Sequence, residues 1–199
     1  MKKGFLALVC GMLFVSSEGY ALIHGQALVG QRKLKPSGGD EITGQEFKLA
    51  VHLDPIPLVP VGFGAYLSAT NFDAPEGMSS YQGSEIGLEL TAWSPVDLLG
   101  LTPYAKLGYT ILGGYVAEVD VDALGSVKFL STPSGTRLAA GLKWSPLPLV
   151  ALMLELEQTD IKLKSDKIKA SAGIDTSNYT MSDVDTSSFG ILLGVEVGI

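Results

Sequence analysis

The chain contains three copies of one six-residue pattern: Asp54-Pro55-Ile56-Pro57-Leu58-Val59, Ser94-Pro95-Val96-Asp97-Leu98-Leu99 and Ser145-Pro146-Leu147-Pro148-Leu149-Val150. Proline cannot donate a hydrogen bond to a β-ladder, and it pushes the residue before it toward an extended conformation. An Asp-Pro or Ser-Pro pair after an alternating run therefore ends a strand and begins a turn. The stretches between consecutive copies have 34 and 45 residues, which is room for two strands of about ten residues each. The pattern predicts a series of hairpins.

The segments between these turns alternate between apolar and polar residues, which is the period of a β-strand with one apolar face. In residues 45–53, for example, Phe47, Leu49 and Val51 share one face. Gly113-Gly114 predicts a bulge in the fifth strand. The polarity of the seventh strand reverses from residue 160 to residue 164, which predicts either a bulge near Gln158 or a strand that continues beyond a membrane. The predicted strands are 22–33, 45–53, 61–72, 84–93, 103–119, 136–144, 150–164 and 188–199.

The first 21 residues have the pattern of a secretory signal peptide. Lys2 and Lys3 form the charged start, residues 4–15 form the apolar run, and small residues precede a predicted cleavage site after Ala21. An uncleaved anchor is the alternative, but the run is shorter than the roughly 20 residues of a spanning helix. Cys10 would leave with this segment, so the mature chain would have no disulfide. We expect one domain over residues 22–199.

The bulk composition limits the partners. The chain has 14 basic and 21 acidic residues and a formal net charge of −7. Removal of the signal peptide takes away two lysines and one glutamate, which leaves a net charge of −8. An acidic surface of this kind disfavours nucleic acid as a partner. The 46% hydrophobic content, divided into short alternating strands, must be buried either in a sandwich core or against lipid.

The predicted connections alternate in length. The three Pro-containing turns are short, whereas the other four connections are predicted to span roughly 10, 10, 16 and 22 residues. Short and long connections in strict alternation, with both termini on the short-turn side, are the layout of a closed, antiparallel, up-and-down transmembrane β-barrel. The predicted fold is therefore all-β with eight strands. Ten strands, or a ribbon outside the membrane, are possible if the last loop holds another hairpin.

With this architecture the chain resembles the small eight-stranded bacterial outer-membrane β-barrels, the group of OmpA-like transmembrane domains and OmpX. Members of the group carry a C-terminal assembly signal of the form polar-x-Gly-x-x-apolar-x-apolar, usually with an aromatic last residue. Gly194, Val197 and Ile199 match its glycine and its two apolar positions. Leu192 stands where a polar residue is usual, and Ile199 is aliphatic where an aromatic residue is usual. The resemblance implies a bacterial outer-membrane location, contact with outer-membrane lipid and lipopolysaccharide, assembly by the barrel-assembly machinery and a monomeric state. It implies no cofactor.

The polar faces of the strands predict an ionic interior. An eight-stranded barrel is just wide enough to be filled by its own side chains. Because unpaired buried charges are costly, near-equal numbers of acids and bases predict mutual pairing. A charged, water-filled channel is the alternative. The predicted inward set is Arg32, Glu46, Lys48, Glu85, Glu89, Lys106, Arg137, Lys143, Glu155, Glu157 and Glu196.

Other residues are candidates for interfaces or sites. Trp93 and Trp144 each precede a Ser-Pro turn, where an interfacial aromatic girdle would lie. Trp93 has the inward parity of its strand, so the alternatives for it are a place in the lumen or on a bulge. Asp120, Asp122, Asp175, Asp183 and Asp185 could gather calcium but lack the spacing of a loop site, so solvated acidic loops are expected. A basic cluster at the outer end of the seventh strand would suit lipopolysaccharide phosphates, with an ordinary exposed strand extension as the alternative. That cluster is Lys162, Lys164, Lys167 and Lys169.

These observations predict a non-enzymatic integral outer-membrane barrel that presents surface loops and has a structural, envelope-integrity or surface-contact role. The alternative function is a narrow pore or transporter for small or apolar solutes. A lipid-modifying enzyme is a third possibility. It would depend on His24 or His52, which are expected to face inward near the periplasmic ends of their strands, with Asp54 as a candidate neighbour. We expect no catalytic, cofactor or metal site.

Overall fold

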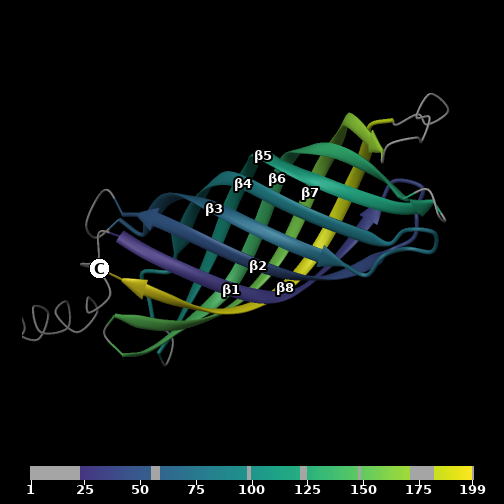
Figure 1. Ribbon diagram of the computed structural model, residues 1–199. Coiled ribbons are helices and arrows are strands. Elements are labelled where there is room, and N and C mark those ends of the chain that lie inside the picture. The colour runs from purple at the N-terminus through teal and green to yellow at the C-terminus, as the bar shows by residue number, and fades with distance from the viewer. Residues whose placement is uncertain are drawn as a thin grey trace, which may run out of the picture.

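The computed structural model describes residues 23–54, 59–97, 100–121, 125–147, 149–170 and 182–198. Eight antiparallel strands form one closed ring in sequence order, so that β8 pairs with β1 (Figure 1). This confirms the predicted eight-stranded up-and-down barrel. The strands are β1 (Ile23–Pro36), β2 (Ile42–Leu53), β3 (Val61–Phe72), β4 (Ser80–Trp93), β5 (Leu101–Val121), β6 (Gly125–Leu147), β7 (Val150–Ala170) and β8 (Val184–Gly198).

The two ends of the barrel differ. At one end, which we call the turn end, β1, β3, β5 and β7 begin and β2, β4, β6 and β8 finish. At the opposite end, which we call the loop end, β1, β3, β5 and β7 finish and the other four strands begin. The predicted signal peptide, residues 1–21, lies outside the described residues. No helix among the residues described is long and apolar enough to cross a membrane.

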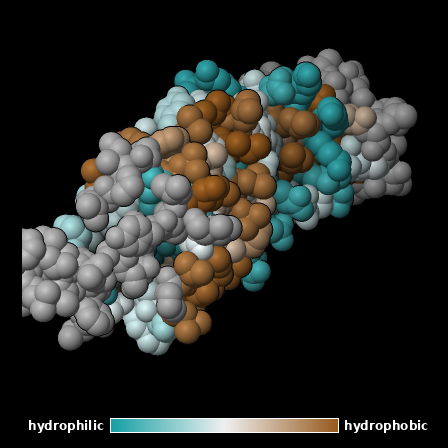
Figure 2. Space-filling view, turned by 90° about the vertical axis from the view of Figure 1, so that its left-hand side faces the viewer, coloured by the Kyte–Doolittle hydropathy of each residue, from teal (hydrophilic) through white to brown (hydrophobic). Residues whose placement is uncertain are grey.

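The outer surface carries a broad apolar band. Large aliphatic and aromatic side chains alternate outward along all eight strands, and Leu88 and Leu193 are 58% and 60% exposed. Figure 2 shows this band in brown, with hydrophilic residues beyond it. Inward positions of the same strands are largely charged or hydroxylated and are buried. This arrangement is the inverse of a soluble sandwich and is that of a transmembrane β-barrel, whose solvent is lipid.

The predicted 16-residue loop between the fifth and sixth strands is wrong. β5 continues to Val121 and β6 begins at Gly125, so only residues 122–124 connect them. From sequence alone, residues 131–135 are easily assigned to a loop, because Pro133 cannot donate to a β-ladder. The β5–β6 register skips from Thr110↔Gly135 to Tyr115↔Ser131, and Pro133 lies within this interruption, where no partner on β5 needs its missing N–H.

The predicted bulge at Gly113-Gly114 lies in the same interruption, on the β5 strand. The register of β5 shifts against both β4 and β6 in this region. Gly113 has a φ of 151°, a conformation that side chains other than glycine rarely adopt. The glycine pair therefore lets β5 accommodate the unpaired residues of this region while it continues toward the loop end.

The reversed polarity of β7 has a different origin from a bulge. Burial alternates without interruption from Ala151 to Lys164, and the β6–β7 register is regular from Trp144↔Leu152 to Ser131↔Ser165. Of the two predicted alternatives, the strand that continues is the one observed. Ile161 and Leu163 point inward into an apolar cluster with Leu34, Phe72 and Tyr115. The interior thus becomes apolar at the loop end, where the exterior becomes polar.

Candidate functional site

The lumen is the largest assembly of buried polar groups in the part of the chain that the structure describes. Inward positions on all eight strands supply it, because side chains alternate between the two faces of each strand. Six carboxylates face five cations, and each of these side chains belongs to a residue at most 8% exposed. They are the eleven residues predicted from strand parity: Arg32, Glu46, Lys48, Glu85, Glu89, Lys106, Arg137, Lys143, Glu155, Glu157 and Glu196.

Two arginines organise the part of the lumen nearest the loop end. Arg137 Nη1 lies 2.8 Å from Glu157 Oε2, and its Nη2 lies 3.1 Å from Glu85 Oε2. Arg32 Nη1 donates to Glu85 Oε1 at 2.6 Å, and Arg137 Nη1 lies 3.3 Å from Glu46 Oε1. The planar guanidinium of Arg137 can serve several carboxylates because its donors diverge in a fixed fork.

Hydroxyl groups add further contacts to this cluster at the loop-end side of the lumen, which we call the upper cluster. The Tyr115 hydroxyl donates to Glu85 at 2.7 Å, and Thr110 donates to the other oxygen of the same carboxylate at 3.0 Å. Tyr66 presents its ring to the Arg137 guanidinium, with 4.5 Å between Cζ and the ring centroid. A buried carboxylate needs such donors as well as a counter-ion, because each lone pair left without a partner carries a desolvation cost.

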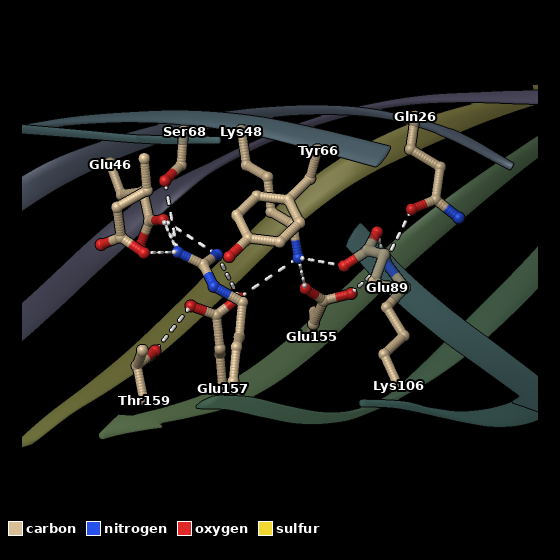
Figure 3. Close-up of polar contacts among 12 residues, drawn as sticks. Gln26, Glu46, Lys48, Tyr66, Ser68, Glu89, Lys106, Glu155, Glu157 and Thr159 are labelled. Atoms are coloured by element: carbon tan, nitrogen blue, oxygen red, sulfur yellow. Dashed lines mark hydrogen bonds and ion pairs between the residues drawn. The ribbon is translucent and has the colours of Figure 1, made fainter. Parts of the chain in front are cut away.

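Two lysines hold the middle of the lumen (Figure 3). Lys48 Nζ lies 3.0 Å from Glu155, 3.2 Å from Glu89 and 3.3 Å from Glu157. Lys106 Nζ lies 2.7 Å from the other oxygen of Glu155. Glu157 contacts both Lys48 and Arg137. That shared carboxylate joins the middle cluster to the upper one.

Gln26 carries the network on to the turn end. Its amide oxygen accepts a hydrogen bond from Lys106 at 2.6 Å, and its amide nitrogen donates to Glu196 at 2.6 Å. Glu196 also pairs with Lys143 at 2.9 Å. Polar contacts are therefore continuous along the lumen from Arg32 to Glu196.

The two histidines lie at the turn end of this network, on β1 and β2. They are directly opposite each other in the register. His24 Nε2 lies 2.7 Å from Asp54 Oδ2, whereas His52 Nε2 lies 2.7 Å from Glu89 Oε1. Each imidazole thus has its own carboxylate, and the expected proximity of His24 to Asp54 is observed.

Sequence reasoning missed the uncharged members of the network. Gln26, Tyr66, Tyr104 and Tyr115 are buried and contact the charged groups. Strand parity could have found the first three, which share the inward face with the charged residues. Tyr115 follows the Gly113-Gly114 bulge, so parity counted from the start of β5 assigns it to the wrong face.

The two tryptophans occupy different environments. Trp144 is 48% exposed on the outer surface. Trp93 instead packs against the buried cluster of Leu28, Tyr104, Met153 and Leu192, so of its predicted alternatives the place in the lumen is the one observed. Its strand keeps the inward parity up to its last residue, so the indole closes part of the lumen near the turn end.

The lysine cluster lies on the outward face of β7, beyond the apolar band. Lys162, Lys164, Lys167 and Lys169 are all exposed, and Lys162 Nζ lies 3.5 Å from Asp183. No group of three or more metal-ligating side chains occurs among the residues the structure describes. Of the five aspartates considered for calcium, Asp122 and Asp175 lie outside those residues.

An apolar outer band, a closed ring of eight strands and an ion-filled interior together define a small transmembrane β-barrel of the bacterial outer-membrane class. No protein-family model and no curated protein sequence matches the chain. Solved structures do match it. The three described below are 8% to 19% identical to this chain, so the likeness establishes the fold.

The fold is similar to that of neisserial surface protein A (NspA), with a TM-score of 0.63 and 19% identity over 89% of this chain and 97% of NspA. It is also similar to OprG from Pseudomonas aeruginosa, with a TM-score of 0.55 and 8% identity over 92% and 98% of the two chains. Ail, the attachment invasion locus protein of Yersinia pestis, matches with a TM-score of 0.53 and 13% identity over 88% and 99%.

Proposed function

We propose that the protein is a non-enzymatic integral protein of the bacterial outer membrane, with a closed lumen and an exposed loop end that contributes to envelope integrity or surface contact. The observation that carries this proposal is the continuous, buried network between Arg32 and Glu196. Side chains that pair with one another fill the space that a permeant solute would need. The turn end faces the periplasm in this proposal, and the loop end faces the exterior.

An apolar layer above the network supports a closed lumen. Leu34, Phe72, Tyr115, Ile161 and Leu163 are at most 6% exposed and pack together at the loop end. Tyr81 packs against this layer, with its ring centroid 5.2 Å from that of Phe72. A hydrated ion would have to displace this apolar layer and then break ion pairs below it, and both steps are costly.

The surface role rests on the strands that extend past the barrel. β5, β6 and β7 have 21, 23 and 21 residues, whereas the other five strands have 12 to 15. The long part of β7 carries the exposed lysines, for which we propose contact with lipopolysaccharide phosphates. NspA and Ail, two of the similar structures, are named as a surface protein and as an attachment invasion protein.

Assembly as a monomer through the barrel-assembly machinery fits the closed ring. β1 and β8 satisfy each other's edges from His24↔Gly198 to Pro36↔Thr186, so neither is free to pair with a second copy. We propose that β8, which carries Gly194 and Val197 of the predicted assembly signal, is the segment that the machinery recognises.

Fractionation and electrical recording test this function. The full chain expressed in a Gram-negative host should be recovered from the outer membrane and should migrate differently on a gel before and after boiling. The purified protein in planar bilayers should give no discrete openings, with a known porin as the positive control. Reproducible single-channel steps would instead support the narrow pore.

The enzymatic alternative has its own test. A lipid-modifying or hydrolytic activity that survives purification and is lost in His24→Ala or His52→Ala would overturn the non-enzymatic assignment. We expect neither substitution to change the lipid composition of the host membrane, because both imidazoles are buried beside lumen carboxylates at the turn end.

A further inference from the structure

A transverse groove of about 620 Å³ crosses the outer surface of β1 to β5 near the loop end. Its floor is made of small residues at consecutive register positions, Ala69, Ser84 and Gly114. A Cβ atom added to Gly114 would meet nothing within 4 Å, so the floor is open. Phe47 and Val29 extend the same register row over β2 and β1.

The register row next to the groove on its turn-end side is apolar. Leu49, Leu67, Ile86 and Leu112 follow one another in register across β2 to β5, and each is at least 40% exposed. The single hydroxyl of the floor is satisfied within the protein, because Ser84 Oγ donates to the Gly114 carbonyl at 3.4 Å. The groove can therefore accept a hydrocarbon chain without burying an unpaired polar group.

The side toward the loop end is a row of carboxamides. Gln31, Gln45, Asn71 and Gln82 are successive register partners on β1 to β4, and all four are exposed. Each carboxamide offers two donors and one acceptor oxygen. Beyond this row, Lys33 and Lys35 continue the outward face of β1.

This order of chemistry matches an acylated sugar lipid. An acyl chain fits the groove, the amides and hydroxyls of an acylated sugar fit a row that both donates and accepts, and lipid phosphates fit the lysines above. A glycerophospholipid offers mainly acceptors at this depth and would leave the carboxamide oxygens without a lipid donor. A groove in the lipid-facing wall is moreover filled by lipid, because an empty one would forfeit dispersion contacts along its whole length.

We propose that this groove binds one outer-leaflet glycolipid, with an acyl chain over Ala69, Ser84 and Gly114 and its sugar on the carboxamide row. The inference rests on the proposed outer-membrane location but is independent of whether the lumen conducts. It also lies apart from the β7 lysines, because the groove belongs to β1 to β5.

Native mass spectrometry of the full chain tests the site. The protein is extracted from outer membranes with a mild detergent, and the bound species are identified by mass as lipopolysaccharide or phospholipid. Wild type should retain one lipopolysaccharide. Ala69→Leu fills the floor and should reduce the retained fraction at least tenfold. Ala140→Leu makes the same change on the outer face of β6, outside the groove, and should retain lipid as wild type does.

The headgroup contact is tested separately with Gln45→Leu combined with Gln82→Leu. This variant should lose lipopolysaccharide at least fivefold while still accepting phospholipid, since the floor remains open. Equal retention by wild type and Ala69→Leu, absence of lipid from wild type, or phospholipid as the species retained by wild type would each overturn the proposal. Normal outer-membrane recovery and heat-dependent gel migration in the same samples show that such a failure concerns the groove and leaves the membrane location intact.

Discussion

Replacement of Arg137 by methionine should destabilise the barrel strongly. Arg137 is 1% exposed and lies within 3.3 Å of Glu46, Glu85 and Glu157. Methionine has a similar length and no charge, so Arg137→Met removes the cation while leaving little empty space. Three carboxylates then remain buried around an apolar side chain.

The expected loss follows from what these carboxylates keep. Glu85 retains Arg32 at 2.6 Å, Glu46 retains Arg32 at 3.7 Å, and Glu157 retains Lys48 at 3.3 Å. None is left without any counter-ion, but the three carboxylates then share one arginine instead of two. Loss of one partner from a buried ion pair costs about 3–5 kcal/mol. Loss of the cation over the Tyr66 ring adds about 0.5–2 kcal/mol.

Urea unfolding in phospholipid vesicles, followed by tryptophan fluorescence at mildly alkaline pH, measures this free energy. Leu138→Met is the matched control, because Leu138 is the next residue, faces lipid, and should lose less than about 1.5 kcal/mol. The double variant Arg137→Met with Glu157→Gln should recover about 1–2 kcal/mol, since the two groups are coupled. A free energy of unfolding for Arg137→Met within about 1 kcal/mol of wild type would refute a lumen held by mutual ion pairing.

Two further predictions concern the outer surface. Leu88→Arg at mid-height of the apolar band should cost about 2–4 kcal/mol in the same urea assay, whereas Leu147→Arg at the last position of β6 should cost about 0–1 kcal/mol; equal costs would contradict the assigned band. The Ser126 hydroxyl and then the Lys128 ammonium hold the pKa of Glu118, beyond the barrel on β5, below its ordinary value of 4.5. Because the pKa of Glu118 is lower in the folded state, its carboxylate adds stability above the ordinary pKa, and this stability is lost as the pH falls through the folded-state pKa. Hydrogen-exchange protection of the β5–β6 tip should therefore fall with acidification in wild type and stay flat in Glu118→Gln, and parallel profiles in the two proteins would contradict it.

Much of the barrel could be predicted from residues 45–53, 61–72 and 84–93, because one local rule governs them. Within the apolar band, every second residue faces lipid and the others face a charged interior, so alternation alone assigns both faces. The short Pro-containing turns fix the count of strands. The same rule places charged residues inside, but it cannot say which acid meets which base. The contacts of Glu157 with both Lys48 and Arg137 depend on strand stagger, which pairs residues far apart in sequence.

The rule fails where its physical basis ends. Beyond the apolar band the exterior is aqueous, so an extended strand must place polar residues outside and apolar residues inside. On β7 this change falls at Asp160, after which Ile161 and Leu163 are the buried residues. If lipid is assumed to surround the whole strand, the change appears to be a shift of parity. It is instead a change of solvent along a strand of constant parity.

That change of solvent also explains why the extended strands and the closed lumen occur together. Strands that continue past the membrane carry apolar inward residues, and the ring brings those residues to the axis above the ion network. Tyr115 connects the two layers, since its ring packs with Phe72 while its hydroxyl donates to Glu85. The apolar layer therefore keeps water from the upper ion pairs, which strengthens them by lowering the local dielectric. The long strands β5 and β7 supply three of the five residues of this layer, namely Tyr115, Ile161 and Leu163. Leu34 and Phe72 come from the shorter β1 and β3, so shortening β5 and β7 should weaken the seal of the lumen without removing it.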